Sequence, residues 1–139
     1  MVKKKRRSSV SAMDKKLDKL VSEVVRAEHP SCVICGRIKY LNCGHFISRV
    51  FRSVRWHPLN VHTQCASCNY KHEFNTIPYT KFMLKKYGAD ILDRIDKLKN
   101  DSKKVTHEDR DHWLDYWIDR KKRLETSIYA YKIERLRKI

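Results

Sequence analysis

Two matched pairs of cysteines constrain this chain more than any other feature of its sequence. Two residues separate the members of each pair, Cys32 and Cys35 in the first and Cys65 and Cys68 in the second. Zinc takes four ligands in a tetrahedron, and each Cys-x-x-Cys turn places two thiolates on one side of the ion. The pairs therefore predict a closed, structural zinc site at Cys32, Cys35, Cys65 and Cys68. We expect the fifth cysteine, Cys43, to be buried as a small apolar residue rather than to bind another ligand.

The charge of the chain indicates its kind of partner. Among 139 residues there are 32 Lys and Arg against 16 Asp and Glu, which gives a net charge of +16. Phosphate neutralisation by such an excess would supply most of the affinity for a nucleic acid and would make binding salt-dependent. We therefore expect DNA as the partner. A structural RNA-binding protein of the ribosomal type would carry a similar charge.

The hydropathy of the sequence disfavours membrane and secreted proteins. The sequence has no apolar run long enough to cross a bilayer, and no apolar segment typical of a signal peptide comes after its basic start. We expect a cytoplasmic protein (of the host cell, if the chain is viral) with reduced cysteines. Neither a membrane partner nor a small-molecule cofactor is expected.

The hydrophobic pattern divides the chain into four parts. Residues 1–10 predict a disordered basic arm, and residues 11–30 predict a helix. Residues 31–78 hold all the cysteines and predict short strands followed by a helix. Residues 79–139 predict further helices for DNA binding or dimerisation. The fold class is therefore α+β, mostly α, with a small zinc-stapled core flanked by helices.

Capping residues predict where these helices begin. Ser11 with Asp14, and Thr106 with Asp109, have the spacing of a capping box. His29-Pro30 should end the first helix. The helix of the core should begin near Ala66, and the next one after Asn75-Thr76, with breaks near Gly88 and residues 100–105.

A set of polar residues lies where the zinc site would hold it in place. It consists of His45 after Gly44, then Asn60, then Asn69 directly after Cys68. A neutral imidazole can take a proton from a water that attacks a phosphodiester, and magnesium prefers oxygen ligands such as an asparagine carbonyl. Each residue also has a structural alternative, as a core histidine, a turn-capping asparagine or a helix-start asparagine.

The motifs of this region resemble those of a known superfamily. Cys32-Val-Ile-Cys35, Gly44-His45-Phe46, Asn60-Val61-His62 and Cys65-Ala-Ser-Cys68-Asn69 are similar to the HNH, or His-Me finger, nucleases. More narrowly, they resemble the NinG (Rap) recombination proteins of lambda-like phages. The resemblance implies a β-hairpin and a helix around one Mg²⁺ or Mn²⁺ ion. It also implies that His45 is the general base, that Asn60 orients the base-bearing loop, and that Asn69 is a metal ligand.

One position departs from the pattern of the superfamily. Many members have an acidic residue or a histidine directly before the catalytic histidine as a second metal ligand, whereas this chain has Gly44. His62 and His72 are nearby candidates for the missing ligand, and His62 is the stronger of the two. Because this ligand is absent, the sequence is also compatible with a DNA-binding protein that has no catalytic activity.

Basic side chains around these motifs are candidates for DNA contacts. Arg49, Arg52 and Arg55 lie between the proposed base and Asn60, and Lys71 comes after the second cysteine pair. Arginine forks suit phosphate, so we expect contacts to the DNA backbone and weak sequence preference. The aromatic residues Trp113 and Trp117 of the last helix suggest either packing on the core or a homodimer.

The residues themselves indicate a phosphodiester and a metal, and with the resemblance to HNH nucleases they predict a metal-dependent DNA endonuclease. Its preference for branched recombination intermediates, such as a Holliday junction, a D-loop or a flap, is implied by the NinG resemblance alone. The alternative is a non-catalytic zinc protein that binds DNA or RNA in recombination or transcription.

Overall fold

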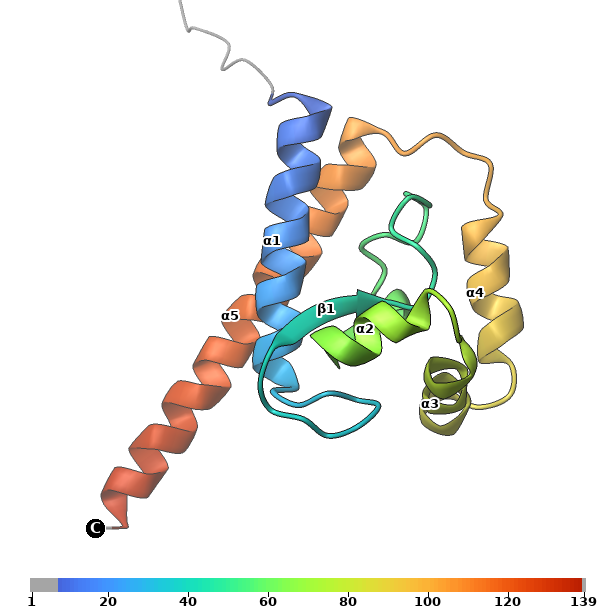
Figure 1. Ribbon diagram of the computed structural model, residues 1–139. Coiled ribbons are helices and arrows are strands. Elements are labelled where there is room, and N and C mark those ends of the chain that lie inside the picture. Colours follow the sequence, from blue (N-terminus) through green and yellow to red (C-terminus); the bar gives the residue numbers. More distant parts are fainter. Residues whose placement is uncertain (1–7, 139) are drawn as a thin grey trace, which may run out of the picture.

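The computed structural model describes residues 8–138, and within them the chain is mostly helical with one two-stranded antiparallel sheet. This confirms the α+β, mostly α, class, and Figure 1 shows the arrangement. No helix in this part of the chain is long and apolar enough to cross a membrane. In chain order the elements are α1 (Val10–Glu28), β1 (Leu41–His45), the 3₁₀ turn η1 (Pro58–Asn60), β2 (Val61–Cys65), α2 (Ala66–His72), α3 (Ile77–Tyr87), α4 (Ile91–Lys99) and α5 (His107–Arg137).

The first helix begins two residues earlier than its sequence suggests. Ser9, not Ser11, is the N-cap, and its hydroxyl accepts a hydrogen bond from the Ala12 amide at 3.2 Å. Asp14 does not complete a capping box because its carboxylate is buried in ion pairs with other elements. The expected basic arm at residues 1–10 therefore ends by Ser9, and residues 1–7 of it lie outside the described residues.

The other predicted helix boundaries agree with the structure. His29 caps the C-terminus of α1, α2 begins at Ala66, and Gly88 ends α3 with a positive φ of 92°. At the start of α5, the Thr106 hydroxyl and the Asp109 carboxylate form the expected capping box. Here the local sequence alone determines the structure, since a cap needs only residues within one turn.

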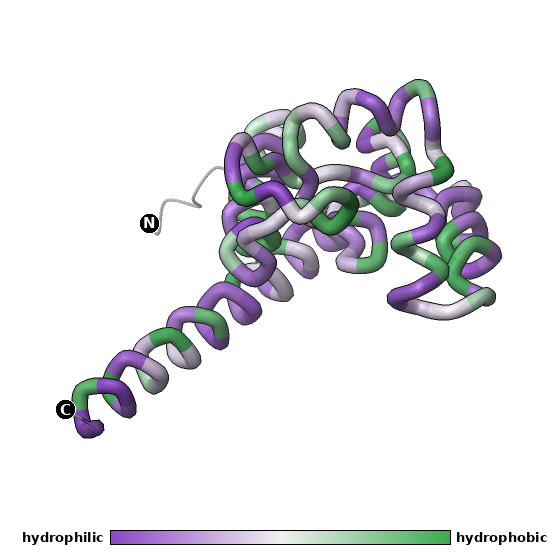
Figure 2. Tube along the Cα trace, turned by 60° about the horizontal axis from the view of Figure 1, so that its bottom comes forward, coloured by the Kyte–Doolittle hydropathy of each residue, from purple (hydrophilic) through white to green (hydrophobic). Residues whose placement is uncertain are grey.

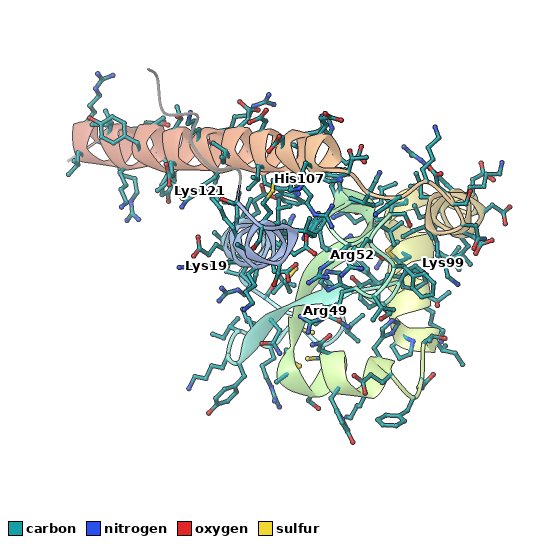
Figure 3. The ribbon with its side chains drawn as sticks, turned by 90° about the horizontal axis from the view of Figure 1, so that it is seen from above. Lys19, Arg49, Arg52, Lys99, His107 and Lys121 are labelled. Atoms are coloured by element: carbon teal, nitrogen blue, oxygen red, sulfur yellow. The ribbon has the colours of Figure 1, made fainter. Side chains whose placement is uncertain are left out.

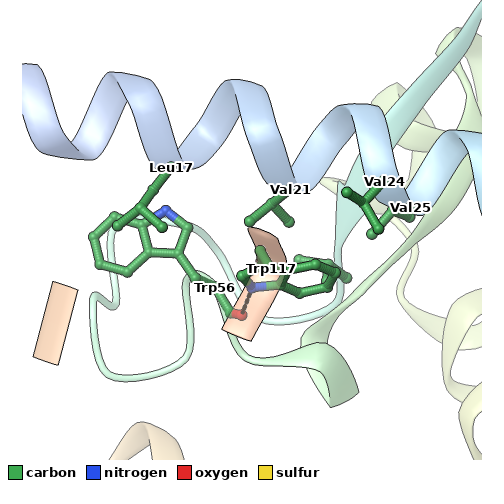
Figure 4. Packing of buried hydrophobic residues seen from close by; sticks show 7 residues of the cluster. Leu17, Val21, Val24, Val25, Trp56 and Trp117 are labelled. Carbon is green, nitrogen blue, oxygen red and sulfur yellow. Dashed lines mark hydrogen bonds between the residues drawn. The ribbon is translucent and has the colours of Figure 1, made fainter. Parts of the chain in front are cut away.

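The larger hydrophobic core lies between α1 and the first half of α5. Leu17, Val21 and Val24 on α1 face the fully buried rings of Trp56 and Trp117 (Figure 4). The Trp117 indole donates a hydrogen bond to the Trp56 carbonyl at 2.9 Å, which ties α5 to the loop between the strands. Trp117 thus packs on the core, which is one of the two alternatives, core packing or a homodimer, that the sequence predicted for this helix.

Ion pairs along the same contact fasten α5 to α1. Buried Arg110 donates to Asp14 at 2.6 Å, and Arg120 forms a two-pronged pair with Glu28 at 2.7 Å. Beyond this contact the C-terminal part of α5 projects away from the rest of the molecule (Figure 2). Ile128 and Tyr131 are exposed there, and the expected homodimer through this helix stays a prediction.

The two strands lie between α1 and the later helices. They pair antiparallel, with Leu41 opposite Cys65 and His45 opposite Val61. On one face the Thr63 hydroxyl donates to the Val25 carbonyl of α1 at 3.1 Å. On the other face lies a second apolar cluster built on α3 and α4, with Tyr79, Met83, Ile91 and Ile95 at its centre. Because α2 comes directly after β2, the hairpin and this helix form one unit.

Candidate metal centre and polar site

The four paired cysteines come together at the start of the hairpin and of α2. The Sγ atoms of Cys32, Cys35, Cys65 and Cys68 all lie within 4.8 Å of one another. Tetrahedral zinc with bonds of about 2.3 Å needs sulfur atoms roughly 3.8 Å apart, and Cys35 and Cys65 have theirs 3.7 Å apart. The donor set therefore fits a metal ion, and it is compatible with structural zinc.

Backbone amides support the thiolates of this cluster. The amides of Ile34 and Cys68 each point at a cysteine sulfur, Cys32 and Cys65 respectively, at 3.4 Å. Burial alone would raise the pKa of the Cys32 thiol, but the backbone groups of Cys35, Cys65 and Ile34 and the Cys35 side chain lower it to about 7. Burial and the neighbouring cysteines raise the pKa of the Cys68 thiol. A thiolate is the form that binds metal, so the surroundings of Cys32 favour the ligand state.

Cys43 has the opposite environment. Its side chain packs against the core between α1 and α5, and burial raises the pKa of its thiol to about 12. It is not part of the four-cysteine cluster. The thiol stays protonated on a half-buried side chain, which also lines the cavity that His45 lines.

The ring of His45 is held in one orientation by the backbone of the loop after β1. Its Nε2 lies 3.0 Å from the Arg55 carbonyl oxygen. Because a carbonyl can only accept, Nε2 carries the proton, and the neutral ring keeps its lone pair on Nδ1. Burial is the largest effect on this group and lowers the pKa of His45 below its ordinary value of 6.5. At neutral pH the ring is therefore in the form that can take up a proton.

Asn60 closes the loop that carries the Arg55 carbonyl. The side chain is completely buried, and its Oδ1 accepts from the Ile47 amide at 2.7 Å. Its Nδ2 donates to the carbonyls of Ile47 at 2.9 Å and Val54 at 3.1 Å. One amide thus joins the two ends of a loop whose geometry sets the position of the His45 ring.

We expect Asn60→Ala to destabilise the chain by roughly 2 to 4 kcal/mol, because it leaves the Ile47 amide and two carbonyls without partners in a buried place. Denaturant unfolding measures this change. Asn69→Ala, at a half-buried asparagine on α2, is the matched control and should cost less than about 1 kcal/mol. Equal losses in the two variants would contradict the role given to the Asn60 amide.

Arg55 is tied to α1 rather than exposed for DNA. Its guanidinium donates to both carboxylate oxygens of Asp18, at 3.0 Å and 2.5 Å, and its side chain is only 14% exposed. Trp56 Nε1 adds a third hydrogen bond to Asp18 at 2.9 Å. Although burial opposes its charge, these donors lower the pKa of the Asp18 carboxyl. Arg55 is therefore engaged with α1 and not exposed in the way expected for a DNA contact, and Asp18 anchors the segment that holds His45.

The other basic candidates lie at the surface. Arg49 and Arg52 stand on the loop after β1, between α1 and the Lys99 end of α4 (Figure 3). Arg52 is 55% exposed although it lies 3.4 Å from Asp14. Lys71 is exposed on α2. Their predicted contacts to DNA stay proposals.

A cavity of about 600 Å³ brings His45 and Asn69 together between β1, the loop after it and α2. His45 and Arg49 line one side of it, and Asn69 and His72 of α2, with Glu73 directly after the helix, line the other. Asn69 and Glu73 are four residues apart, one helical turn, and both oxygen-bearing side chains line the same cavity. Such a donor set suits a hard divalent cation.

Similarity to known phage proteins extends over most of the chain. The family model described as "Bacteriophage Lambda NinG protein" matches residues 1–126. The chain belongs to the NinG family. Among curated proteins, "Protein ninG" of Escherichia phage lambda is 26% identical over 72 residues, which are 50% of this chain and 35% of that protein. The chain thus spans about a third of the length of the curated relative that it matches. No solved structure matches it significantly.

In this NinG-family chain, His62, a candidate for the missing metal ligand, lies between two tyrosines and does not line the cavity of His45. Both of its ring nitrogens bind tyrosine hydroxyls, Nδ1 with Tyr79 and Nε2 with Tyr87, each at 2.7 Å. Burial, together with nearby cations, lowers the pKa of His62 to about 3, so the ring is neutral and has no nitrogen left for an ion. The residue instead joins β2 to α3.

Two features of this NinG-family site could not be read from the sequence. A Cβ at Gly44 would collide with the side-chain amide of Gln64, whose Cδ would lie 2.6 Å away, so any larger residue here would displace that amide. Asp18 reaches Arg55 across 37 residues of sequence. The sequence motifs assign no role to Gln64 or Asp18, so only the fold reveals what these side chains contact.

Proposed function

We propose that this NinG-family chain is a metal-dependent DNA endonuclease, and that His45 is its general base. The observation that carries the proposal is the hydrogen bond from His45 Nε2 to the Arg55 carbonyl, since it leaves a lone pair on Nδ1 of a ring that lines a cavity with Asn69. The fixed tautomer and the lowered pKa are what a base working near neutral pH needs.

The residues of the cavity supply the other parts of such a reaction. Nδ1 of His45 would accept the proton of the attacking water, while the Arg55 carbonyl keeps the ring in place. Arg49, which lines the same cavity, would hold the scissile phosphate. Asn69, with Glu73 as a further oxygen donor, would hold Mg²⁺ or Mn²⁺, and the ion would stabilise negative charge on the phosphate and the leaving oxygen.

DNA binding would come from the basic side chains around this cavity. Arg49 and Arg52 share the loop after β1, and Lys71 is exposed on α2. Together with the net charge of +16, they favour contacts to the phosphate backbone. A preference for Holliday junctions, D-loops or flaps rests on the resemblance to NinG recombination proteins.

A cleavage assay across DNA geometries tests this proposal. Linear duplex, flap, D-loop and four-way-junction DNA are incubated with the zinc-loaded chain in Mg²⁺, in Mn²⁺ and without added divalent ion. We expect cleavage only with a divalent ion, and faster cleavage of the branched substrates. Salt-sensitive binding to the same DNA without any cleavage would contradict the proposed nuclease activity and would favour a non-catalytic DNA-binding protein.

A further inference from the structure

The surface at the C-terminal end of α2 carries aromatic rings that are open to water. Tyr70 is 65% exposed and Phe74 is 74% exposed, and their ring centroids lie 5.2 Å apart. Ile77, at the start of α3, is exposed as well. Large apolar side chains that gather at the surface mark a binding site more often than a part of the fold.

Two neighbouring cavities extend from these rings along α3. The first, of about 380 Å³, is lined by Phe74 and Lys71, and the second, of about 710 Å³, by Phe82 and three lysines of α3. Ile34 of the first cysteine turn and Pro78 line both cavities, so the two lie side by side. We call them together the α3 groove. Its walls combine aromatic and aliphatic side chains with lysines.

The charge of the α3 groove is positive. Neither cavity is lined by a carboxylate, and residues 30–88 of the chain hold nine Lys and Arg against one acidic residue, Glu73. Four thiolates on zinc would add two negative charges and leave this segment strongly basic. Four exposed lysines line the groove without an ion pair to any residue within 8–138: Lys71, Lys81, Lys85 and Lys86. A second copy of this chain would bring like charges together here, so the groove favours an anionic partner.

The position of the groove indicates which anion that is. His72 lines both the first cavity of the groove and the cavity of His45 and Asn69. The end of α2 therefore separates the two places, and a strand held at His45 needs only to pass this end to reach Phe74. An acidic protein segment would match the charge, but a nucleic acid also matches the neighbouring cavity.

We propose that the α3 groove binds a single-stranded segment of DNA, with unpaired bases stacked on Tyr70 and Phe74 and phosphates beside the lysines of α3. An unpaired base offers its flat faces to aromatic rings, whereas a duplex buries these faces and presents only base edges. Rings beside a basic groove bind single strands with little regard to sequence. The inference rests on the proposed function in one respect, since it takes the strand to continue from the cavity of His45.

Fluorescence anisotropy with a labelled oligothymidylate tests the groove in the zinc-loaded chain, without added divalent ion so that binding is measured apart from cleavage. A stacked ring contributes roughly 5- to 150-fold in affinity, so Tyr70→Ala and Phe74→Ala should each bind at least fivefold more weakly. Phe74→Leu, which keeps an apolar side chain without a ring, should bind as weakly as Phe74→Ala. Tyr129→Ala is the matched control, because this tyrosine is 66% exposed on the projecting part of α5, and it should bind like the unchanged chain. His45→Gln should bind normally as well.

Two further variants report on stacking and on charge. The fluorescence of Phe74→Trp should be quenched when oligothymidylate binds, and that of Tyr129→Trp should not. Lys85→Gln should lower the slope of log affinity against log salt by about 0.7, the value for one phosphate contact on a single strand. Lys97→Gln, at an exposed lysine of α4 outside the groove, should leave that slope unchanged.

The proposal is overturned if Tyr70→Ala and Phe74→Ala bind oligothymidylate as tightly as the unchanged chain, or if Phe74→Trp is not quenched. It is also overturned if these changes spare oligothymidylate binding but abolish binding of a glutamate-rich peptide that contains phenylalanine, or dissociate a dimer in sedimentation. Oligothymidylate binding that depends on Phe74, in a chain that cleaves no DNA, would support the groove and count against the nuclease alone. Cleavage by a chain whose single-strand binding ignores Phe74 would do the reverse.

Discussion

Removal of zinc from the four-cysteine site is expected to unfold the hairpin and α2. The segment between the first cysteine pair and β1 has almost no apolar packing of its own, since Ile38 is 72% exposed and Tyr40 76%. The backbone of the Cys32–Cys35 turn reaches β2 through the hydrogen bond from the Val33 amide to the Thr63 carbonyl, at 2.9 Å. Structural zinc contributes about 10 to 16 kcal/mol in small zinc domains near pH 7, far more than a short loop can replace.

The measurement uses two cysteine variants and a zinc assay. The unchanged chain should release one zinc ion per molecule, and Cys68→Ala should release almost none and lose its cooperative thermal transition. Cys43→Ala is the matched control for zinc binding, because this cysteine lies outside the cluster and packs against the core. It should keep its zinc and lose about 1 to 2 kcal/mol of stability. Full zinc occupancy in Cys68→Ala would show that the four thiols do not form the site.

The sequence predicts those parts of the fold that depend on neighbours in the chain. The cysteine pairs, the Thr106 capping box and the end of α3 at Gly88 each depend on residues within one or two turns. The predicted start of α1 at Ser11 is wrong. The capping box needed the Asp14 carboxylate, which instead pairs with Arg110, 96 residues away in the sequence. Ser9 and Ser11 are both of a residue type that caps helices, and the local sequence does not decide between them. The contact of Asp14 with the distant Arg110 does.

The candidate site shows the same limit. His45, Asn60 and Asn69 could be selected by spacing, and the structure places His45 and Asn69 on one cavity with Asn60 closing the loop beside it. Side-chain direction could not be predicted. Arg55 has the spacing of a phosphate contact but turns toward Asp18 on α1, and His62 turns toward two tyrosines. Periodicity assigns residues to faces of a strand, but the partner across each face comes from another part of the chain.

Replacement of His45 should abolish cleavage with little change in the fold. A general base contributes roughly 10² to 10⁴ in rate, so we expect His45→Ala to cleave at least a hundredfold more slowly under single-turnover conditions. His45→Gln is the sharper variant, because a glutamine amide can still donate to the Arg55 carbonyl but cannot accept a proton from water. It should be as inactive as His45→Ala while keeping the stability of the unchanged chain. His112→Ala, at an exposed histidine of α5, should cleave at the normal rate.

The pH dependence of cleavage distinguishes a base from a residue that only supports the loop. Burial lowers the pKa of His45 below its ordinary value of 6.5, so the neutral, active form persists as the pH falls through 6.5. The rate should therefore decline only at lower pH, with a slope of one proton. Arg49 is among the cations that lower this pKa, and Arg49→Met should move the decline toward higher pH whatever it does to the maximal rate. A decline that stays in place in Arg49→Met, or an active His45→Gln, would assign the titration to another group and remove His45 from the chemistry.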